Sequence, residues 1–274
     1  MKLGIINGWE EGHFKAVAVK GLEAVEFCIN YNYDSAEVLK KAEEIKENSI
    51  KYNVGVASIG RWGMDRIDED GNVIAEALQH DKNLIDLASI VGCPVFNTGC
   101  NFIESKTYYE NCLIAIDYFK TLIDYAEGKG VKIATYNCDW CNFVCEERAW
   151  AVVHGALPEL GIKYDPSHCY NRGGDYLREL RDWGDRVCHF HVKGVLHIAG
   201  DGFDDPPAGL DGLNWGAIMT MLYVNDYNGV LSIEPHSGKW KGAKGQWGVD
   251  FTINYMKQFI MPENYEASSD PYMP

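Results

Sequence analysis

Short apolar runs alternate along the chain with longer segments that carry apolar residues at helical spacings. The runs are rich in β-branched residues and apolar at nearly every position, which is typical of parallel strands buried on both faces. They cover residues 2–7, 24–30, 54–60, 93–99, 131–137, 161–165, 187–192 and 229–234. The pattern therefore predicts eight strands, each followed by a helical segment.

Residues suited to helix ends stand where this alternation requires them. Asp34 with Glu37, and Thr107 with Glu110, have the spacing of a capping box at a helix start. Between the strands, apolar residues recur at spacings of three, four or seven, as in the segments 38–52 and 116–126. The glycines expected at helix ends are Gly21, Gly92, Gly128 and Gly130.

Eight strand–helix units close most simply into a single (β/α)₈ TIM barrel, an α/β fold. The main alternative is a doubly wound open sheet, which usually carries a glycine-rich phosphate loop after its first strand. Residues 7–12 (NGWEEG) match that loop poorly. We assign the barrel to residues 1–262 and expect an irregular C-terminal extension over residues 263–274.

Composition and charge narrow the range of functions. The chain has 274 residues, 46% of them hydrophobic, and a formal net charge of −15. A field of this sign repels nucleic acids and anionic membranes, and it opposes phosphorylated substrates unless a local cation compensates. The first residues do not resemble a signal peptide, and no apolar run approaches the length of a membrane span. The 9 cysteines, an odd count, favour reduced thiols and a cytoplasmic protein.

Chemistry in a barrel collects at the carboxyl ends of the strands. There the sequence places Asp165, His191 and Glu234 on consecutive strands, with Glu26 near the end of the second strand. Carboxylates with a single imidazole suit one divalent metal ion, Mn²⁺ first, with Mg²⁺, Co²⁺ or Zn²⁺ as alternatives. Strand alternation points His189 to the same side as His191 but deeper, where we expect a satisfied core histidine.

Other polar and aromatic residues follow the same strand ends. His168 suits a substrate hydroxyl or a proton shuttle, or else it pairs with the backbone of its loop. Lys193 either supplies the local cation or is a surface lysine. The turn-rich segment 194–212 is a candidate lid or a plain surface loop. Residues expected at a sugar-sized pocket, unless the tryptophans only pack, are Trp9, Trp62 and Asn97.

Taken together, these motifs resemble one family. The glutamate of the second strand, DPSH at 165–168, HFHVKG at 189–194 and GVLSIE at 229–234 are similar to the sugar phosphate isomerase/epimerase family, the xylose isomerase-like TIM barrels. The resemblance covers nearly the whole chain and is specific for the superfamily rather than for a substrate. It implies one divalent ion held by Glu, Asp, His and Glu from the last four strands. Asp165, His191 and Glu234 match three of these ligands, and His168 matches the family's substrate-contacting histidine.

The sequence departs from the family pattern at the end of the fifth strand. The family places its first glutamate ligand there, and this chain has Tyr136. Asn137 offers a neutral oxygen to the ion, or Asp139 reaches back from the loop; otherwise a water joins three protein ligands. Epimerisation between two opposed metal-bound glutamates would lack one carboxylate. His197 stands where the family has an arginine, so a phosphate site is unsupported, and we place His197 with Lys193 among the substrate-binding candidates.

We therefore expect a metal-dependent sugar isomerase or epimerase that acts α to a carbonyl, with Glu234 as the base and His168 as acid or orienting group. A lyase that performs β-elimination on a keto-sugar or inosose is one alternative, because it needs one base and one acid. A non-catalytic barrel subunit is another, motivated by Tyr136. A DNA-repair nuclease is disfavoured by the charge and by too few spare metal ligands. The expected partner is a neutral small-molecule sugar or keto-sugar, with no nucleic acid and no membrane, and a homo-oligomer is left open.

Overall fold

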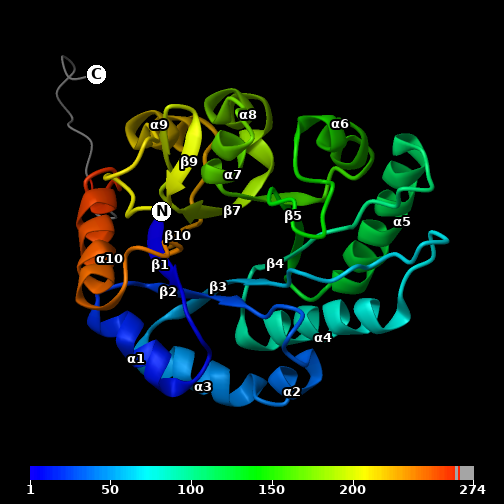
Figure 1. Ribbon diagram of the computed structural model, residues 1–274. Coiled ribbons are helices and arrows are strands. Elements are labelled where there is room, and N and C mark those ends of the chain that lie inside the picture. The colour runs from blue at the N-terminus through cyan, green and yellow to red at the C-terminus, as the bar shows by residue number, and fades with distance from the viewer. Residues whose placement is uncertain (263–264, 266–274) are drawn as a thin grey trace, which may run out of the picture.

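The computed structural model describes residues 1–262 and residue 265. In this part of the chain, eight parallel strands pair in the closed order β1-β10-β7-β6-β5-β4-β3-β2 (Figure 1). The predicted (β/α)₈ barrel is confirmed, and every predicted strand is present with its ends within two residues. The extension predicted over residues 263–274 lies, except for residue 265, outside the described residues. The barrel strands are β1 (Lys2–Ile6), β2 (Ala24–Cys28), β3 (Gly55–Gly60), β4 (Val95–Thr98), β5 (Lys132–Tyr136), β6 (Gly161–Tyr164), β7 (Val187–Val192) and β10 (Val230–Ile233).

Helices surround the barrel and cover the outer faces of its strands, as Figure 1 shows. Thr107 and Glu110 form the predicted capping box of α5, and Asp34 accepts a hydrogen bond from the Ala36 backbone at the start of α2. Gly92 ends α4 at a left-handed φ of 72°. The helices are α1 (Glu11–Val19), α2 (Ser35–Leu39), α3 (Ala42–Tyr52), α4 (Ala75–Val91), α5 (Tyr108–Ala126), α6 (Glu147–Ala156), α7 (Pro166–Asn171), α8 (Tyr176–Trp183), the 3₁₀ turn η1 (Gly184–Arg186), α9 (Trp215–Val224) and α10 (Gly242–Lys257).

Strand alternation puts polar side chains inside the barrel and apolar side chains against the helices. On β7, His189 and His191 both reach Glu26 on β2, which lies across the barrel interior. Phe190, between them, packs against Tyr164 with ring centroids 6.0 Å apart. The expected orientation of β7, with both imidazoles on one side and Phe190 on the other, is confirmed.

Two segments differ from the sequence prediction. The periodic segment 38–52 is divided between α2 and α3, because the backbone leaves helical geometry at Lys41 (φ −91°, ψ 5°). The segment 194–212, expected as a candidate lid or a plain surface loop, contains an antiparallel hairpin that the sequence did not predict, β8 (Leu196–Ile198) and β9 (Asp201–Asp204). Ala199 and Gly200 take positive φ values of 54° and 92°, and such positive angles suit the tight turn of a hairpin.

All 9 cysteines lie in the described part of the chain as free thiols, in agreement with the expected reduced state. Most are buried, and burial raises the pKa of thiols such as Cys93 and Cys100 to about 12, so these two are unreactive at neutral pH. Within residues 1–262 and 265, none of the helices combines the length and apolar character that a membrane crossing requires.

Candidate metal centre

Asp165 is the N-cap residue of α7, and this contact helps to fix it at the mouth of the barrel. It follows β6, and its Oδ1 accepts a hydrogen bond from Ser167 N at 2.9 Å, which caps α7 with Pro166 in the first turn. The Asn137 amide donates to the Asp165 carbonyl at 2.8 Å and accepts from its N–H at 2.9 Å. The backbone and one carboxylate oxygen are thus fixed, and Oδ2 remains available.

His191 and Glu234 complete a compact group with Asp165. His191 Nδ1 lies 2.7 Å from Glu234 Oε2 and 3.8 Å from Asp165 Oδ2. One ligand atom from each of the three residues lies within 4.8 Å of the others. The structure therefore brings together the three residues that the sequence places at the ends of consecutive barrel strands.

This group fits a divalent ion. Asp165 is fully buried, and its Oδ2 has no hydrogen-bond donor among the described residues. A buried polar atom without a partner is rare in folded proteins, and a cation would satisfy it. Two carboxylates and one imidazole suit Mn²⁺, Mg²⁺ or Zn²⁺, and three protein ligands leave coordination positions open for substrate or water.

Glu26 lies directly behind His191. Its Oε2 is 2.8 Å from His191 Nε2 and 2.7 Å from His189 Nε2. A carboxylate behind a metal-binding imidazole fixes its tautomer, so that Nε2–H donates to Glu26 and Nδ1 faces Asp165 and Glu234. Glu26, His189 and His191 are also close enough to hold an ion. Glu26 is already hydrogen-bonded to both imidazoles there, so the unpartnered oxygen of Asp165 favours the other group.

Burial and neighbouring charges decide which groups in this network are protonated. Burial alone would raise the pKa of Glu26, but His189 and His191 outweigh it and hold that pKa well below its ordinary value. Burial also lowers the pKa of His189, whereas Glu26 overcomes the same effect at His191 and raises its pKa. Without a metal, Glu26 is therefore ionised, and His191 is the imidazole that holds the extra proton. His189 is the satisfied core histidine that the sequence predicted.

Lys193 supplies the local cation of the site. Its Nζ lies 3.7 Å from Asp165 Oδ2 and 4.0 Å from Glu234 Oε1, and the side chain is 5% exposed. The alternative of a surface lysine is therefore excluded. Burial would raise the pKa of both carboxyls, but the charge of Lys193 is the largest opposing effect and keeps both values lowered. Asp165 and Glu234 are consequently ionised at neutral pH.

His168 stands at the same opening. It lies on α7, and its Nε2 is 3.5 Å from Asp165 Oδ2. Burial lowers the pKa of His168 to about 4. The imidazole is therefore uncharged at neutral pH, so it can accept a proton or a hydrogen bond but cannot act as the resting general acid.

The end of β5 carries no carboxylate. Tyr136 is fully buried, its hydroxyl donates to the Trp140 carbonyl at 2.9 Å, and burial raises its pKa, so the hydroxyl stays protonated. The Asn137 amide is engaged with the backbone of Asp165, and Asp139 is exposed on the loop. Asn137 thus positions Asp165 in this structure, and its role as a metal ligand stays a prediction.

The aromatic and amide residues expected around the substrate lie in two places. Trp62 is buried with its ring 5.2 Å from that of Tyr136, and Asn97 is fully buried with its Oδ1 unpartnered among the described residues. Trp9 instead packs edge-on against two aromatic rings beside β2, and His197 hydrogen-bonds an amide of α7 at 2.7 Å. Trp62 and Asn97 are thus in the barrel mouth, whereas Trp9 and His197 make their contacts at the rim.

Lys163 is a residue of the mouth that sequence reasoning missed. It lies on β6 two positions before Asp165 and is 2% exposed. Because side chains alternate along a strand, Lys163 shares the inward face of β6 with Asp165. The sequence could have predicted this, because side chains two positions apart on a strand lie on the same face.

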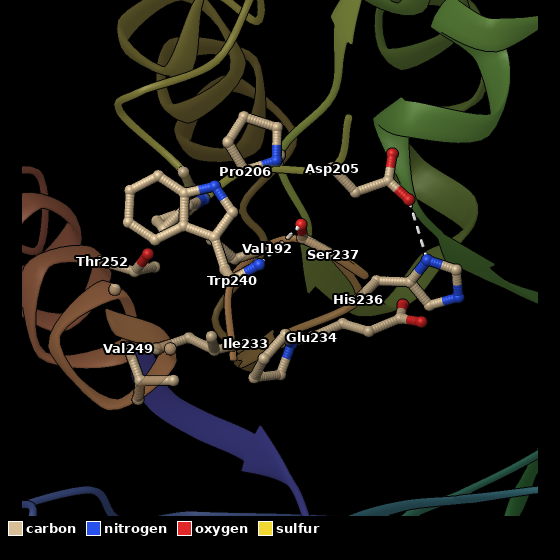
Figure 2. A pocket seen from close by; sticks show the side chains of 16 residues that line it. Val192, Asp205, Pro206, Ile233, Glu234, His236, Ser237, Trp240, Val249 and Thr252 are labelled. Atoms are coloured by element: carbon tan, nitrogen blue, oxygen red, sulfur yellow. Dashed lines mark hydrogen bonds and ion pairs between the residues drawn. The ribbon is translucent and has the colours of Figure 1, made fainter. Parts of the chain in front are cut away.

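A pocket adjoins Glu234 on the side of α10 (Figure 2). In Figure 2, Glu234 and His236 extend to the same side, away from Trp240, and His236 Nδ1 pairs with Asp205 Oδ2 at 2.8 Å. Asp165 and His191 do not line this pocket, so it lies beside the metal-ligand group rather than over it. Its other labelled lining residues are Val192, Pro206, Ile233, Ser237, Val249 and Thr252.

Three solved structures share the fold of this chain over nearly its whole length. D-allulose 3-epimerase from Methylomonas sp. is 15% identical with a TM-score of 0.75, over 95% of this chain and 98% of that one. The IolI protein with a bound zinc atom is 17% identical with a TM-score of 0.75, over 94% and 98%. The probable 3-DHS dehydratase AsbF from Bacillus anthracis is 12% identical with a TM-score of 0.68, over 94% and 99%.

No curated protein matches the chain significantly in sequence. The family model described as the xylose isomerase-like TIM barrel does match it, over residues 14–255. This match agrees with the closed barrel, and it supports the resemblance found in the strand-end motifs. The chain therefore belongs to the xylose isomerase-like TIM barrel family.

Proposed function

We propose that this protein is a metal-dependent enzyme that moves a proton at the carbon α to a carbonyl of a small sugar or keto-sugar. The observation that carries the proposal is the compact group of Asp165, His191 and Glu234 at the barrel mouth, in which the buried Asp165 Oδ2 accepts no hydrogen bond from the described residues. A bound divalent ion would act there as a Lewis acid that acidifies the neighbouring C–H. The epimerase, the zinc-bound protein and the dehydratase that share this fold support the same class of chemistry.

Glu234 is the base in this proposal. Its side chain is 20% exposed at the mouth, whereas Asp165 is fully buried and holds the cap of α7 with its other oxygen. Lys193, beside both carboxylates, keeps Glu234 ionised and ready to accept a proton. Asp165 and Glu26 keep His191 in place from opposite sides.

The acid partner is Lys193 rather than His168. Nearby carboxylates raise the pKa of Lys193 against the opposing effect of burial, so its ammonium keeps a proton at neutral pH. His168 is uncharged there and serves to orient a substrate hydroxyl or to accept a proton. Of the two roles predicted for His168, acid or orienting group, the proposal retains the orienting one.

One carboxylate base and one ammonium acid favour aldose–ketose isomerisation as the first candidate. A second candidate is β-elimination, in which the base removes the α-proton and the acid protonates the leaving oxygen. The specific observation behind it is Tyr136, whose buried, protonated hydroxyl replaces a second base at the end of β5. Epimerisation between two opposed carboxylates does not fit this arrangement.

Proton exchange with solvent tests the proposal. Protein loaded with Mn²⁺ or Zn²⁺ is incubated in D₂O with a panel of aldoses, ketoses, keto-sugars and inososes, and deuterium incorporation is followed by NMR. We expect incorporation α to the carbonyl of at least one substrate, and a loss of about 10²- to 10⁴-fold in Glu234→Gln. Glu179→Gln is the matched control, because Glu179 is a buried carboxylate that bonds Tyr164 at 2.7 Å, outside the ligand group.

Two results would overturn the proposal. Undiminished turnover in a folded Glu234→Gln variant would remove Glu234 as the base. Failure of the purified protein to take up any divalent ion, together with no exchange on the panel, would favour the non-catalytic barrel instead.

A further inference from the structure

Lys163 is a buried cation without a partner. It lies on β6, opposite Tyr136 of β5 and His189 of β7 in the strand register, and it is 2% exposed. Its Nζ lies 5.7 Å from the centroid of the Trp62 ring. In the described part of the chain, Lys163 makes no hydrogen bond and no ion pair within 4 Å. The Nζ is not among the fully buried atoms that lack a partner, so the little exposed surface of Lys163 leaves its amino group open to a ligand.

The contrast with Lys193 indicates what Lys163 lacks. Lys193 lies within 4.0 Å of both Asp165 and Glu234, so these two carboxylates already have a lysine beside them. Glu26, the third carboxylate of the barrel mouth, is hydrogen-bonded to both imidazoles of β7. Among the residues that the structure describes, no carboxylate therefore contacts Lys163 closely enough to neutralise its charge.

The surroundings of Lys163 include a second unsatisfied group. Asn97 Oδ1 is buried and has no donor among the described residues. A side chain in place of Gly60 would meet both this oxygen, at 2.7 Å, and the edge of the Trp62 ring, at 2.1 Å. Asn97 Oδ1 and the edge of the Trp62 ring thus both pack closely around Gly60, and Lys163 faces the same indole ring. A cation beside an aromatic surface suits an anionic, hydroxylated ligand.

The balance of charges at the barrel mouth also favours an anionic ligand. Glu26, Asp165 and Glu234 carry three negative charges, and Lys163 and Lys193 carry two positive ones. A divalent ion would leave the mouth with one positive charge in excess. An anionic ligand would remove this excess in a region of low dielectric constant, where an unbalanced charge is expensive.

We propose that Lys163 binds a carboxylate of the substrate, so that the natural substrate is a sugar acid or another hydroxylated keto acid rather than a neutral sugar. This inference rests on the proposed function and deepens it by naming the substrate class. In this arrangement the face of Trp62 packs against the carbon chain of the ligand. Lys163 also overcomes locally the repulsion that a net charge of −15 imposes on an anion.

Matched pairs of ligands test the proposal by binding rather than by turnover. Isothermal titration calorimetry on the Mn²⁺-loaded protein compares D-glucuronate with D-glucose, D-galacturonate with D-galactose, and D-gluconate with D-sorbitol. We expect the acid of at least one pair to bind about 10- to 100-fold more tightly than its neutral partner. Lys163→Met should abolish this preference while Mn²⁺ binding is retained.

Two further variants control for charge and folding. Lys132→Met removes the same charge from an exposed residue at the opposite end of β5, and it should leave the preference unchanged. Lys163→Arg keeps the positive charge and should keep the preference for the acid, which covers the case in which the methionine variant does not fold.

The outcomes separate this inference from the proposed function. If no acid binds more tightly than its neutral partner, or if Lys163→Met keeps the preference, Lys163 does not bind a carboxylate. If neutral sugars alone exchange their α-proton in D₂O, the inference fails while the proposed function stands. If acids bind through Lys163 but no proton exchanges on any substrate, the proposed function fails and Lys163 remains an anion-binding residue.

Discussion

Replacing Glu26 by glutamine tests how the metal ligand His191 is held. In the wild-type protein, Glu26 Oε1 and Oε2 lie 2.9 and 2.8 Å from His191 Nε2, and Oε2 lies 2.7 Å from His189 Nε2. A glutamine keeps one acceptor oxygen and places an NH₂ group where the second oxygen was. That NH₂ group cannot accept from an imidazole N–H, so at least one buried hydrogen bond to a charged group is lost.

The expected magnitudes follow from that loss. A hydrogen bond to a charged group contributes about 1.5–3 kcal/mol, so the free energy of unfolding of the metal-free protein should fall by about that amount. Loss of the residue that orients a metal-binding histidine typically lowers metal affinity about 10- to 100-fold. Because the pKa of Glu26 is lowered in the folded state, its stabilisation is present above the ordinary glutamate pKa and is lost as pH falls. The difference in the free energy of unfolding between wild type and Glu26→Gln should therefore become smaller as pH falls below the ordinary glutamate pKa.

The assays are urea denaturation in the presence of EDTA and calorimetric titration with Mn²⁺ and Zn²⁺. Glu179→Gln serves as the control, since it changes a buried carboxylate beside Tyr164, outside the ligand group, and should leave the metal affinity unchanged. If a folded Glu26→Gln protein binds both metals as tightly as wild type, Glu26 does not orient His191 for metal binding.

Two further predictions address proton linkage and local folding. Because the pKa of His191 is raised in the metal-free site, protons compete with the ion, and the apparent metal affinity should fall about tenfold per pH unit below that raised pKa. Calorimetry in buffers of different ionisation enthalpy should show release of about one proton below that pKa, and affinity independent of pH would contradict the assignment of Nδ1 as the ligand. Thr107→Ala removes the capping box at the start of α5 and should lower the free energy of unfolding by about 0.5–2 kcal/mol, measured by urea denaturation. An unchanged denaturation midpoint would show that the cap contributes nothing in this protein.

Most of the fold could be predicted because each barrel strand is a continuous apolar run between helices with their own start and stop signals. The capping box at Thr107 and Glu110 and the left-handed end of α4 at Gly92 are local features, and the sequence displays them directly. The hairpin of β8 and β9 was missed because its strands are short and exposed, with charged residues at positions 201 and 204. Strands of three and four residues are too short for an alternating pattern to be recognised in the sequence.

The candidate site was predictable where it depends on strand ends and not where it depends on pairing across the barrel. Asp165, His191 and Glu234 each follow or end a strand, so topology alone brings them together. The link between Glu26 and His191 crosses the interior between strands that are not neighbours, and it required coordinates. The engagement of Asn137 with the backbone of the Asp165 loop likewise depends on exact placement, which sequence spacing does not give.

Locating the bound ion is the most direct test of the proposal that Asp165, His191 and Glu234 form the metal site. Crystals soaked in Mn²⁺ or Zn²⁺ and measured at the absorption edge of the metal would locate it by anomalous scattering. We predict a single strong peak bounded by Asp165 Oδ2, His191 Nδ1 and Glu234, which disappears in Asp165→Asn. A peak between Glu26, His189 and His191, or no peak in the barrel mouth at saturating metal, would contradict it.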